Sequence, residues 1–266
     1  METIRYPDPD ENGVETWRPQ GNHDQYQFKV KPGIKKVRFG DPGWRLGYTR
    51  DAINSYYVFR NLKKEGLVPK HVRFQVCIPL TYSCLAAFIP DSDDLEKVVP
   101  GFTEALIAEI TEMLRHIPPT ELAIQWDMAI ENRLIEVPLK EGNLAGAKAE
   151  AKRVAQPAND ICSAIPADVA IGYHSCYGTL DGWPSRHPPD ATGTVLLLNA
   201  VVEASGRQVE FVHFPTLAAA DETFFRPFED IELRGARAYV GAIHRLHGLN
   251  GLKAQIECIK KFLPKF

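Results

Sequence analysis

Apolar residues along this chain follow two different periods, one typical of strands and one typical of helices. Short runs rich in β-branched and aromatic residues predict strands at residues 72–80, 122–130, 169–173, 209–214 and 236–243. Between these runs, apolar residues recur every three or four positions and predict helices near residues 49–62, 102–117, 143–163, 194–202 and 252–263. Most of the strands read as apolar on both faces, which favours a parallel sheet covered by helices and an α/β fold.

Prolines predict where the regular pattern is interrupted. Pro100 predicts that a helix begun near Asp93 breaks and that a new one starts, and Pro157 predicts a break in the alanine-rich helix. Near the amino terminus, Lys31-Pro32-Gly33 predicts a turn between two short strands, within an otherwise irregular segment of about 1–45.

Composition narrows the class of protein. With 266 residues, 44% of them hydrophobic, the chain suits one domain over residues 1–266. The formal net charge of −3 disfavours nucleic acid and membrane surfaces as partners. No apolar run is long enough to span a bilayer, and the five cysteines lack a repeating spacing, so we expect a cytoplasmic protein with free thiols.

Polar residues gather where the predicted strands end. Asp127, His174, Cys176, His213 and His244 lie near the carboxyl ends of four successive strands. Because the carboxyl ends of parallel strands meet at one edge of a sheet or barrel, this is where we expect a site for a small-molecule ligand.

His174 and Cys176 are the sharpest signal among these residues. Residues i and i+2 of a strand point to the same face, so an imidazole and a thiol can converge on a soft cation such as zinc. The alternative is that Cys176 packs as a small apolar residue while His174 bonds a main-chain carbonyl. Asp127 is also open to a role as a turn cap, and His213 and His244 to roles in the core.

Neighbouring residues extend the candidate site. Trp126 adjoins Asp127, and Tyr177 follows the His-x-Cys pair. We expect Glu131 and Glu136 to be solvated, although Glu131 is near enough to the strand ends to reach a ligand. Phosphate-loop, dinucleotide and serine-nucleophile motifs are missing, and a cysteine hydrolase based on Cys176 is a minor alternative.

These residues resemble a known family. The Ile124-Gln125-x-Asp127 strand, the His174-x-Cys176 pair and Ala242-Ile243-His244 are similar in order and spacing, over residues 70–250, to the catalytic barrel of cobalamin-independent methionine synthase and its single-barrel relatives. The resemblance implies a TIM-type (β/α) barrel in which zinc activates a thiol that takes a methyl group from a methylated folate. The thiolate of a zinc-bound thiol is the nucleophile in such chemistry.

The resemblance also implies roles for single residues. It matches His174 and Cys176 to zinc ligands, Asp127 to the carboxylate that holds the substrate's amino group, and His244 to a histidine of proton transfer. A looser match of residues 7–13 places Glu11 toward the substrate.

The chain departs from the family's pattern in several places. His213 stands where the family has a glutamate ligand and is our candidate for the third zinc ligand. The fourth ligand, a cysteine on the last barrel strand, has no counterpart. We therefore expect an incomplete barrel whose first and last strands are missing or replaced, with a second copy of the chain as a candidate for covering the open edge.

Three functional hypotheses follow. The first is a methionine-synthase-like zinc-dependent methyltransferase acting on a small, homocysteine-like thiol. The second is a barrel that binds a small molecule or a partner without turnover. The third is an enzyme like the related uroporphyrinogen decarboxylases, which needs no metal.

Overall fold

The computed structural model describes residues 4–5, 27–39, 46–178, 184–218, 220–244 and 248–263. The chain divides into two compact units. The first consists of Met1–Val72 and Pro79–Pro118, and the second of Arg73–Ile78 and Pro119–Phe266.

The first unit is mainly helical. Its elements are β1 (Ile4–Arg5), β2 (Lys29–Val30), α1 (Tyr48–Lys64), α2 (Thr81–Leu85) and α3 (Ser92–Met113). The apolar stripe of α3 is buried, as its spacing predicts, whereas α1 buries Ala52 and Tyr56 but leaves Leu62 exposed. Gly66 follows α1 with a φ of 78°. A glycine adopts this left-handed conformation without a steric penalty, which is why the helix ends there.

The predicted amino-terminal hairpin is only partly correct. The turn forms, since the Ile34 amide donates to the Lys31 carbonyl over 3.2 Å. However, β2 pairs with β1 in an antiparallel ladder, with Val30 opposite Ile4, and not with the residues after the turn. The Val37 amide instead donates to the carbonyl of Lys97, so α3 takes the hydrogen bond that a hairpin partner would have supplied.

Two prolines lie inside continuous helices, which contradicts the predicted breaks. Pro100 lies within α3 and Pro157 within α5 (Leu144–Ser163). Each proline costs its helix one backbone hydrogen bond. Both helices bury long apolar stripes on either side of the proline, and most helical stability in proteins comes from such packing.

The second unit contains a five-stranded parallel sheet flanked by helices, which confirms the predicted α/β class. Its strands are β3 (Phe74–Pro79), β4 (Leu122–Met128), β5 (Ala170–Ser175), β6 (Phe211–Pro215) and β7 (Arg237–Gly241), and they match the five predicted runs. The helical elements are η1 (Pro119–Glu121), α4 (Ile130–Lys140), α5, α6 (Thr192–Ala204), α7 (Glu222–Phe225), η2 (Arg226–Asp230) and α8 (Gly248–Phe262). The finer expectation, a TIM-type barrel that is incomplete at its first and last strands, stays a prediction.

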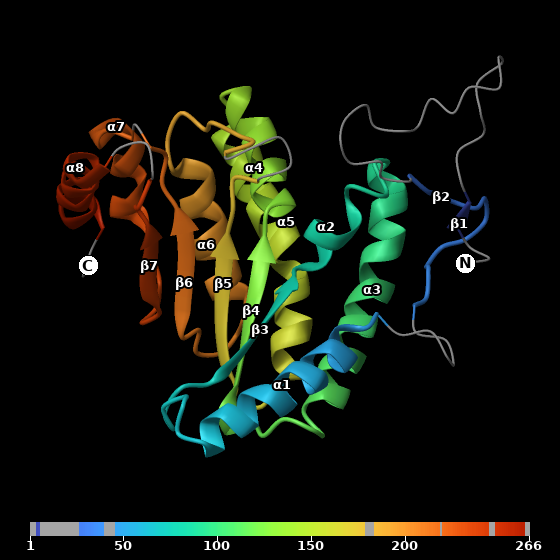
Figure 1. The fold of residues 1–266 in the computed structure, drawn as a ribbon. Helices are drawn as coiled ribbons and strands as arrows, with labels where there is room; N and C mark the ends of the chain where they lie inside the picture. The colour runs from blue at the N-terminus through green and yellow to red at the C-terminus, as the bar shows by residue number, and fades with distance from the viewer. Residues whose placement is uncertain are drawn as a thin grey trace, which may run out of the picture. The chain divides into compact units, whose positions relative to one another are not determined.

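The order of the strands determines which face of the sheet is covered. The order β3-β4-β5-β6-β7 follows the chain without a reversal. Since crossovers between parallel strands are right-handed, successive connections in one direction place their helices on the same face. Figure 1 shows α5 and α6 behind the sheet in this way. Trp126, Tyr173 and Phe214 are buried on this helix-covered face.

The other face is not apolar, which corrects the expectation that the strands are apolar on both sides. We call it the open face; its side chains are Gln75, Cys77, Gln125, Asp127, His174, Phe211, His213 and Tyr239, all of them exposed or half-buried. In β3 and β4 apolar and polar residues alternate, so one face packs under the helices while the other carries the chemistry-bearing groups. None of the described helices combines the length and the apolar character needed to cross a membrane.

Candidate functional site

Three of the predicted site residues form a row across the open face. Asp127 lies opposite His174 in the β4–β5 ladder, and His174 lies opposite His213 in the β5–β6 ladder. Tyr239 continues the row on β7. Opposite residues on neighbouring strands are separated only by the distance between the two strands. The register alone therefore brings a carboxylate and two imidazoles together near the carboxyl ends of the strands.

The two imidazoles of this row stack on each other. Their ring centroids lie 4.7 Å apart with an interplanar angle of 21°. Burial lowers the pKa of His174, and the negative charge of Asp127 and a hydrogen bond to the main chain of His213 oppose this shift. Burial and the neighbouring His174 also lower the pKa of His213. Both rings are therefore neutral at pH 7, the form in which imidazole binds metal ions and accepts protons.

One atom of the pair lacks an explanation within the fold. His174 Nδ1 is buried and has no hydrogen-bond partner among the described residues. Buried polar atoms in proteins are nearly always hydrogen-bonded, so an orphaned ring nitrogen indicates a missing ligand, water or ion.

A polar network that the sequence did not predict lies beside Asp127. Gln125 Nε2 donates to Asp127 Oδ1 over 2.8 Å and lies 3.5 Å from Cys77 Sγ. Gln75 Nε2 also lies 3.5 Å from the same sulfur and donates to Gln125 Oε1 over 3.2 Å. The sequence does contain a pattern that could have predicted this network. Gln75 and Cys77 alternate with apolar residues in β3, which places both side chains on the face that Asp127 occupies.

An aromatic patch adjoins the imidazole row. The ring of Phe211 lies over Gly172, so closely that a Cβ atom on this glycine would overlap it. Tyr239 packs edge-on against Phe211, with ring centroids 5.9 Å apart. The open face thus offers a ligand an apolar surface next to ionisable groups.

Cys176 follows directly after β5 and continues its pairing. Its amide donates to the Met128 carbonyl over 3.0 Å, and its sulfur accepts the Gly178 amide over 3.2 Å. Ser175 and Tyr177 are fully buried while His174 and Cys176 are half-buried, so this segment keeps the alternation of an extended strand. The structure therefore places His174 and Cys176 on the same face, as the spacing predicts.

His244 belongs to a hydrogen-bonded group beyond β7. Its Nε2 lies 3.0 Å from Thr216 Oγ1, and the same hydroxyl donates to Gln255 Oε1 over 2.7 Å. A hydroxyl has one hydrogen, so the shorter bond to Gln255 leaves its oxygen to accept a hydrogen bond from the tautomer of His244 that carries hydrogen on Nε2. Thr216 and Gln255 are buried, which holds this imidazole in place.

The four predicted substrate-binding neighbours of the row fall in different places. Trp126 is fully buried on the helix-covered face, opposite to Asp127. Tyr177 is fully buried, with its hydroxyl 3.0 Å from Thr194 Oγ1, and burial raises the pKa of its phenol. Glu131 is fully buried in the first turn of α4. Glu11 lies outside the described residues.

The expectation that Glu131 and Glu136 are solvated is wrong. Both glutamates lie on α4, a helix that the apolar pattern did not predict and that carries them into the interior of the second unit. Glu136 forms an ion pair with Arg186, and buried carboxylates in proteins are normally paired in this way.

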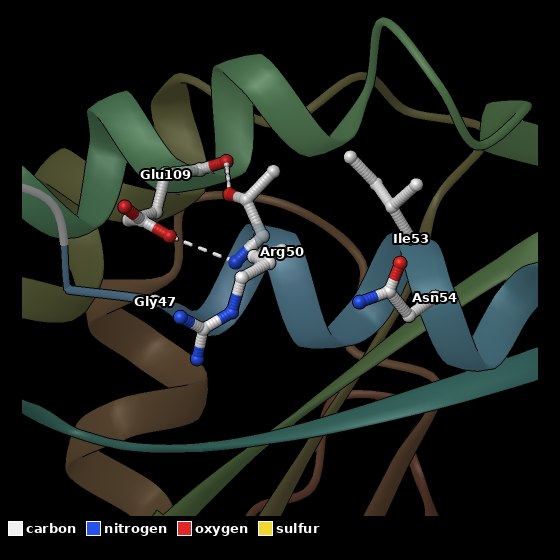
Figure 2. Close-up of a pocket in the computed structure, with 6 residues that line it drawn as sticks. Gly47, Arg50, Ile53, Asn54 and Glu109 are labelled. Carbon is white, nitrogen blue, oxygen red and sulfur yellow. Dashed lines mark hydrogen bonds between the residues drawn. The ribbon is translucent and has the colours of Figure 1, made fainter.

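A cavity of about 290 Å³ lies beside the start of α1 in the first unit. Figure 2 shows Glu109 directed at this end of the helix. The buried carboxylate of Glu109 accepts the Leu46 amide over 3.1 Å and the Thr49 amide over 2.8 Å. An internal anion thus satisfies amide groups that an external one would otherwise bind, so the cavity offers little attraction to a phosphate or carboxylate ligand.

The residues of the open face fit a metal only in part. Among the described residues, no group of three or more His, Cys, Asp and Glu side chains could hold a metal ion as they stand. The neutral imidazoles and the orphaned His174 Nδ1 are suitable donors, but a zinc site needs three or four ligands. Comparison with protein-family models, curated proteins and solved structures gives no match for this chain. No relative therefore indicates a reaction for this site, and its chemistry has to be inferred from its own residues.

Proposed function

We propose that the protein binds a small thiol on the open face and transfers a methyl group to it, with zinc held by His174, Cys176 and His213. The observation that carries this proposal is the register that aligns Asp127, His174 and His213 across three neighbouring parallel strands. The unreversed strand order, which is that of an α/β barrel, supports the same comparison with methionine-synthase-like barrels.

The chain's own groups suit distinct steps of this reaction. His174 and His213 are neutral imidazoles beside each other, and Cys176 offers a thiol two residues along the same strand from His174. Zinc, when bound, lowers the pKa of a coordinated thiol and keeps it nucleophilic at neutral pH. Asp127, oriented by Gln125, offers a carboxylate to an ammonium group of the acceptor.

The methyl transfer itself needs a proton. The acceptor sulfur forms a bond to the methyl carbon while the bond from that carbon to the donor nitrogen breaks. The donor, which we propose to be a methylated folate, then takes a proton at that nitrogen. His244, fixed by its contact with Thr216, is the residue that we assign to this proton transfer.

Binding without turnover is the second candidate function. One observation favours it: within the described residues, no three His, Cys, Asp or Glu side chains of the open face are arranged to hold a metal ion together. Such a protein would hold a ligand against Phe211 and Tyr239 with Asp127 as its polar anchor.

Metal analysis and a methyl-transfer assay separate these functions. We expect stoichiometric zinc in the purified protein, and its loss in His174→Gln and Cys176→Ser variants. Cys258→Ser, which changes a half-buried cysteine of α8, is the matched control. Labelled methyl-tetrahydrofolate and a panel of thiols then report turnover.

Each outcome has one meaning. Zinc together with thiol methylation supports the proposal. Zinc or thiol binding without methylation supports the second function. A parent protein that binds no zinc, even after reconstitution, contradicts the methyltransferase proposal, and carbon dioxide release from carboxylate substrates with chelator present would support the decarboxylase-like hypothesis instead.

A further inference from the structure

We propose that Arg186 is a positioning residue that fixes the main chain of Cys176 at the carboxyl end of β5; its relevance to zinc rests on the proposed function. Arg186 Nη2 donates to the Cys176 carbonyl over 2.6 Å and to the Ala129 carbonyl over 3.2 Å. Its other terminal nitrogen, Nη1, donates to the Glu136 carboxylate. Hydrogen bonds from a charged donor are stronger than those between neutral groups.

The guanidinium joins the ends of two strands that carry site residues. Ala129 follows β4, which carries Asp127, and Cys176 follows β5, which carries His174. A planar guanidinium presents its donors in a fixed geometry, so contact with both carbonyls sets the spacing between these strand ends.

The main chain of Cys176 is held on both sides. Its amide bonds the Met128 carbonyl, and its own carbonyl bonds Arg186. The Arg186 amide in turn donates to the Tyr177 carbonyl over 3.1 Å, and the guanidinium carbon lies 5.7 Å from the centroid of the Tyr177 ring. The sulfur of Cys176 accepts the Gly178 amide, so the restraints on the main chain also set the direction from which the thiol is reached.

The position of Arg186 is itself fixed. Its side chain is 15% exposed and that of Glu136 is 9% exposed, so the ion pair is well shielded from water. Both residues line a cavity of about 360 Å³. A different side chain at position 186 therefore has room to turn away without overpacking the core, and its effect reports the lost contacts.

Arg207 is a matched control at the opposite end of β5. Its guanidinium also bonds main-chain carbonyls, at distances of 2.7–2.9 Å, and these belong to Ile165, Pro166, Ala167 and Val169. Replacing Arg207 removes a comparable clamp from the segment that leads into the same strand, without touching Cys176.

The test is the alkylation rate of each cysteine, followed by iodoacetamide labelling and peptide mapping in the presence of a chelator. In Arg186→Met the main chain of Cys176 loses a restraint, so we expect its thiol to react with iodoacetamide about tenfold faster or more. This factor corresponds to the free energy of a hydrogen bond to a charged donor. Cys77, exposed on β3, is the internal reference and should react at the parent rate. Arg207→Met should leave both rates unchanged.

A second variant and a second measurement keep the outcome decisive. Arg186→Lys retains a charge for Glu136 but cannot bond both carbonyls, so it should also accelerate Cys176; it decides the matter if Arg186→Met fails to fold. Zinc affinity should fall about 10–100-fold in either variant, as for residues that orient metal ligands.

A parent-like rate for Cys176 in folded Arg186→Lys would overturn the proposal, as would equal acceleration in Arg207→Met. Since alkylation is measured without metal, a parent protein that binds no zinc would contradict the proposed function alone and leave this result standing.

Discussion

The stacked histidine pair predicts that the protein loses stability as the pH falls below neutrality. The pKa values of His174 and His213 are lowered in the folded protein, by burial in both cases and by mutual repulsion at His213. An unfolded chain protonates its histidines near pH 6.5. Between that pH and the lower folded pKa values the unfolded state binds more protons, so the stability that is fully present above pH 6.5 declines with falling pH.

The size of the effect follows from proton counting. Each histidine that is protonated in the unfolded state and neutral in the folded state changes the free energy of unfolding by about 1.4 kcal/mol per pH unit. The pair therefore sets an upper slope of about 2.7 kcal/mol per pH unit, a large part of the 5–15 kcal/mol that typical domains possess.

Urea unfolding at a series of pH values between neutrality and about pH 5 measures this slope. A chelator excludes metal binding, and the fully buried Trp126 gives a fluorescence signal. His213→Phe keeps an aromatic ring against His174 but removes one proton site and its repulsion, so the slope should fall to half or less. The exposed His71 is the control, since His71→Asn removes an imidazole away from the pair. The reasoning would be refuted if the stability of the parent protein stays constant or rises as the pH falls. An unchanged slope in His213→Phe would refute it as well.

Three further substitutions test how the units are built. Gly172→Ala places a methyl group against the Phe211 ring and should cost about 1–3 kcal/mol in chemical denaturation; Phe211→Ala in the same chain should recover most of the loss, and an additive result would contradict the packing. Glu109→Gln removes the negative charge at the start of α1 and should lower the free energy of unfolding by about 0.5–2 kcal/mol; an unchanged thermal midpoint would show that the charge is not needed. Thr216→Val takes the hydroxyl from His244 and should cost about 1–3 kcal/mol, whereas Thr216→Ser should cost clearly less; equal losses would point to the methyl group instead.

The sequence located the strands and the helices between most of them because both leave a periodic trace in the order of apolar residues. It also indicated that Asp127, His174 and His213 lie together, since parallel strands align their carboxyl ends. Local patterns were less informative where packing overrides propensity. Pro100 and Pro157 are tolerated because the helices around them are anchored by buried apolar residues, which a rule based on one residue does not take into account.

Other features depend on contacts between distant parts of the chain. Arg186 reaches the ends of two strands and the glutamate of α4 across 10 to 57 positions, and no spacing rule connects these residues. The pairing of Gln125 with Cys77 likewise required the neighbouring positions of β3 and β4.

By itself, then, the sequence determined the α/β class, the five strands and the residue types offered at their carboxyl ends, because these follow from the periodicity of neighbouring residues. Only the tertiary structure decided which side chains face each other. The register stacks His174 on His213, the helical cover buries Trp126 and Tyr177, and the ion pair of Glu136 holds Arg186 at Cys176. Burial, and with it pKa and accessibility, depends on groups far apart in the chain.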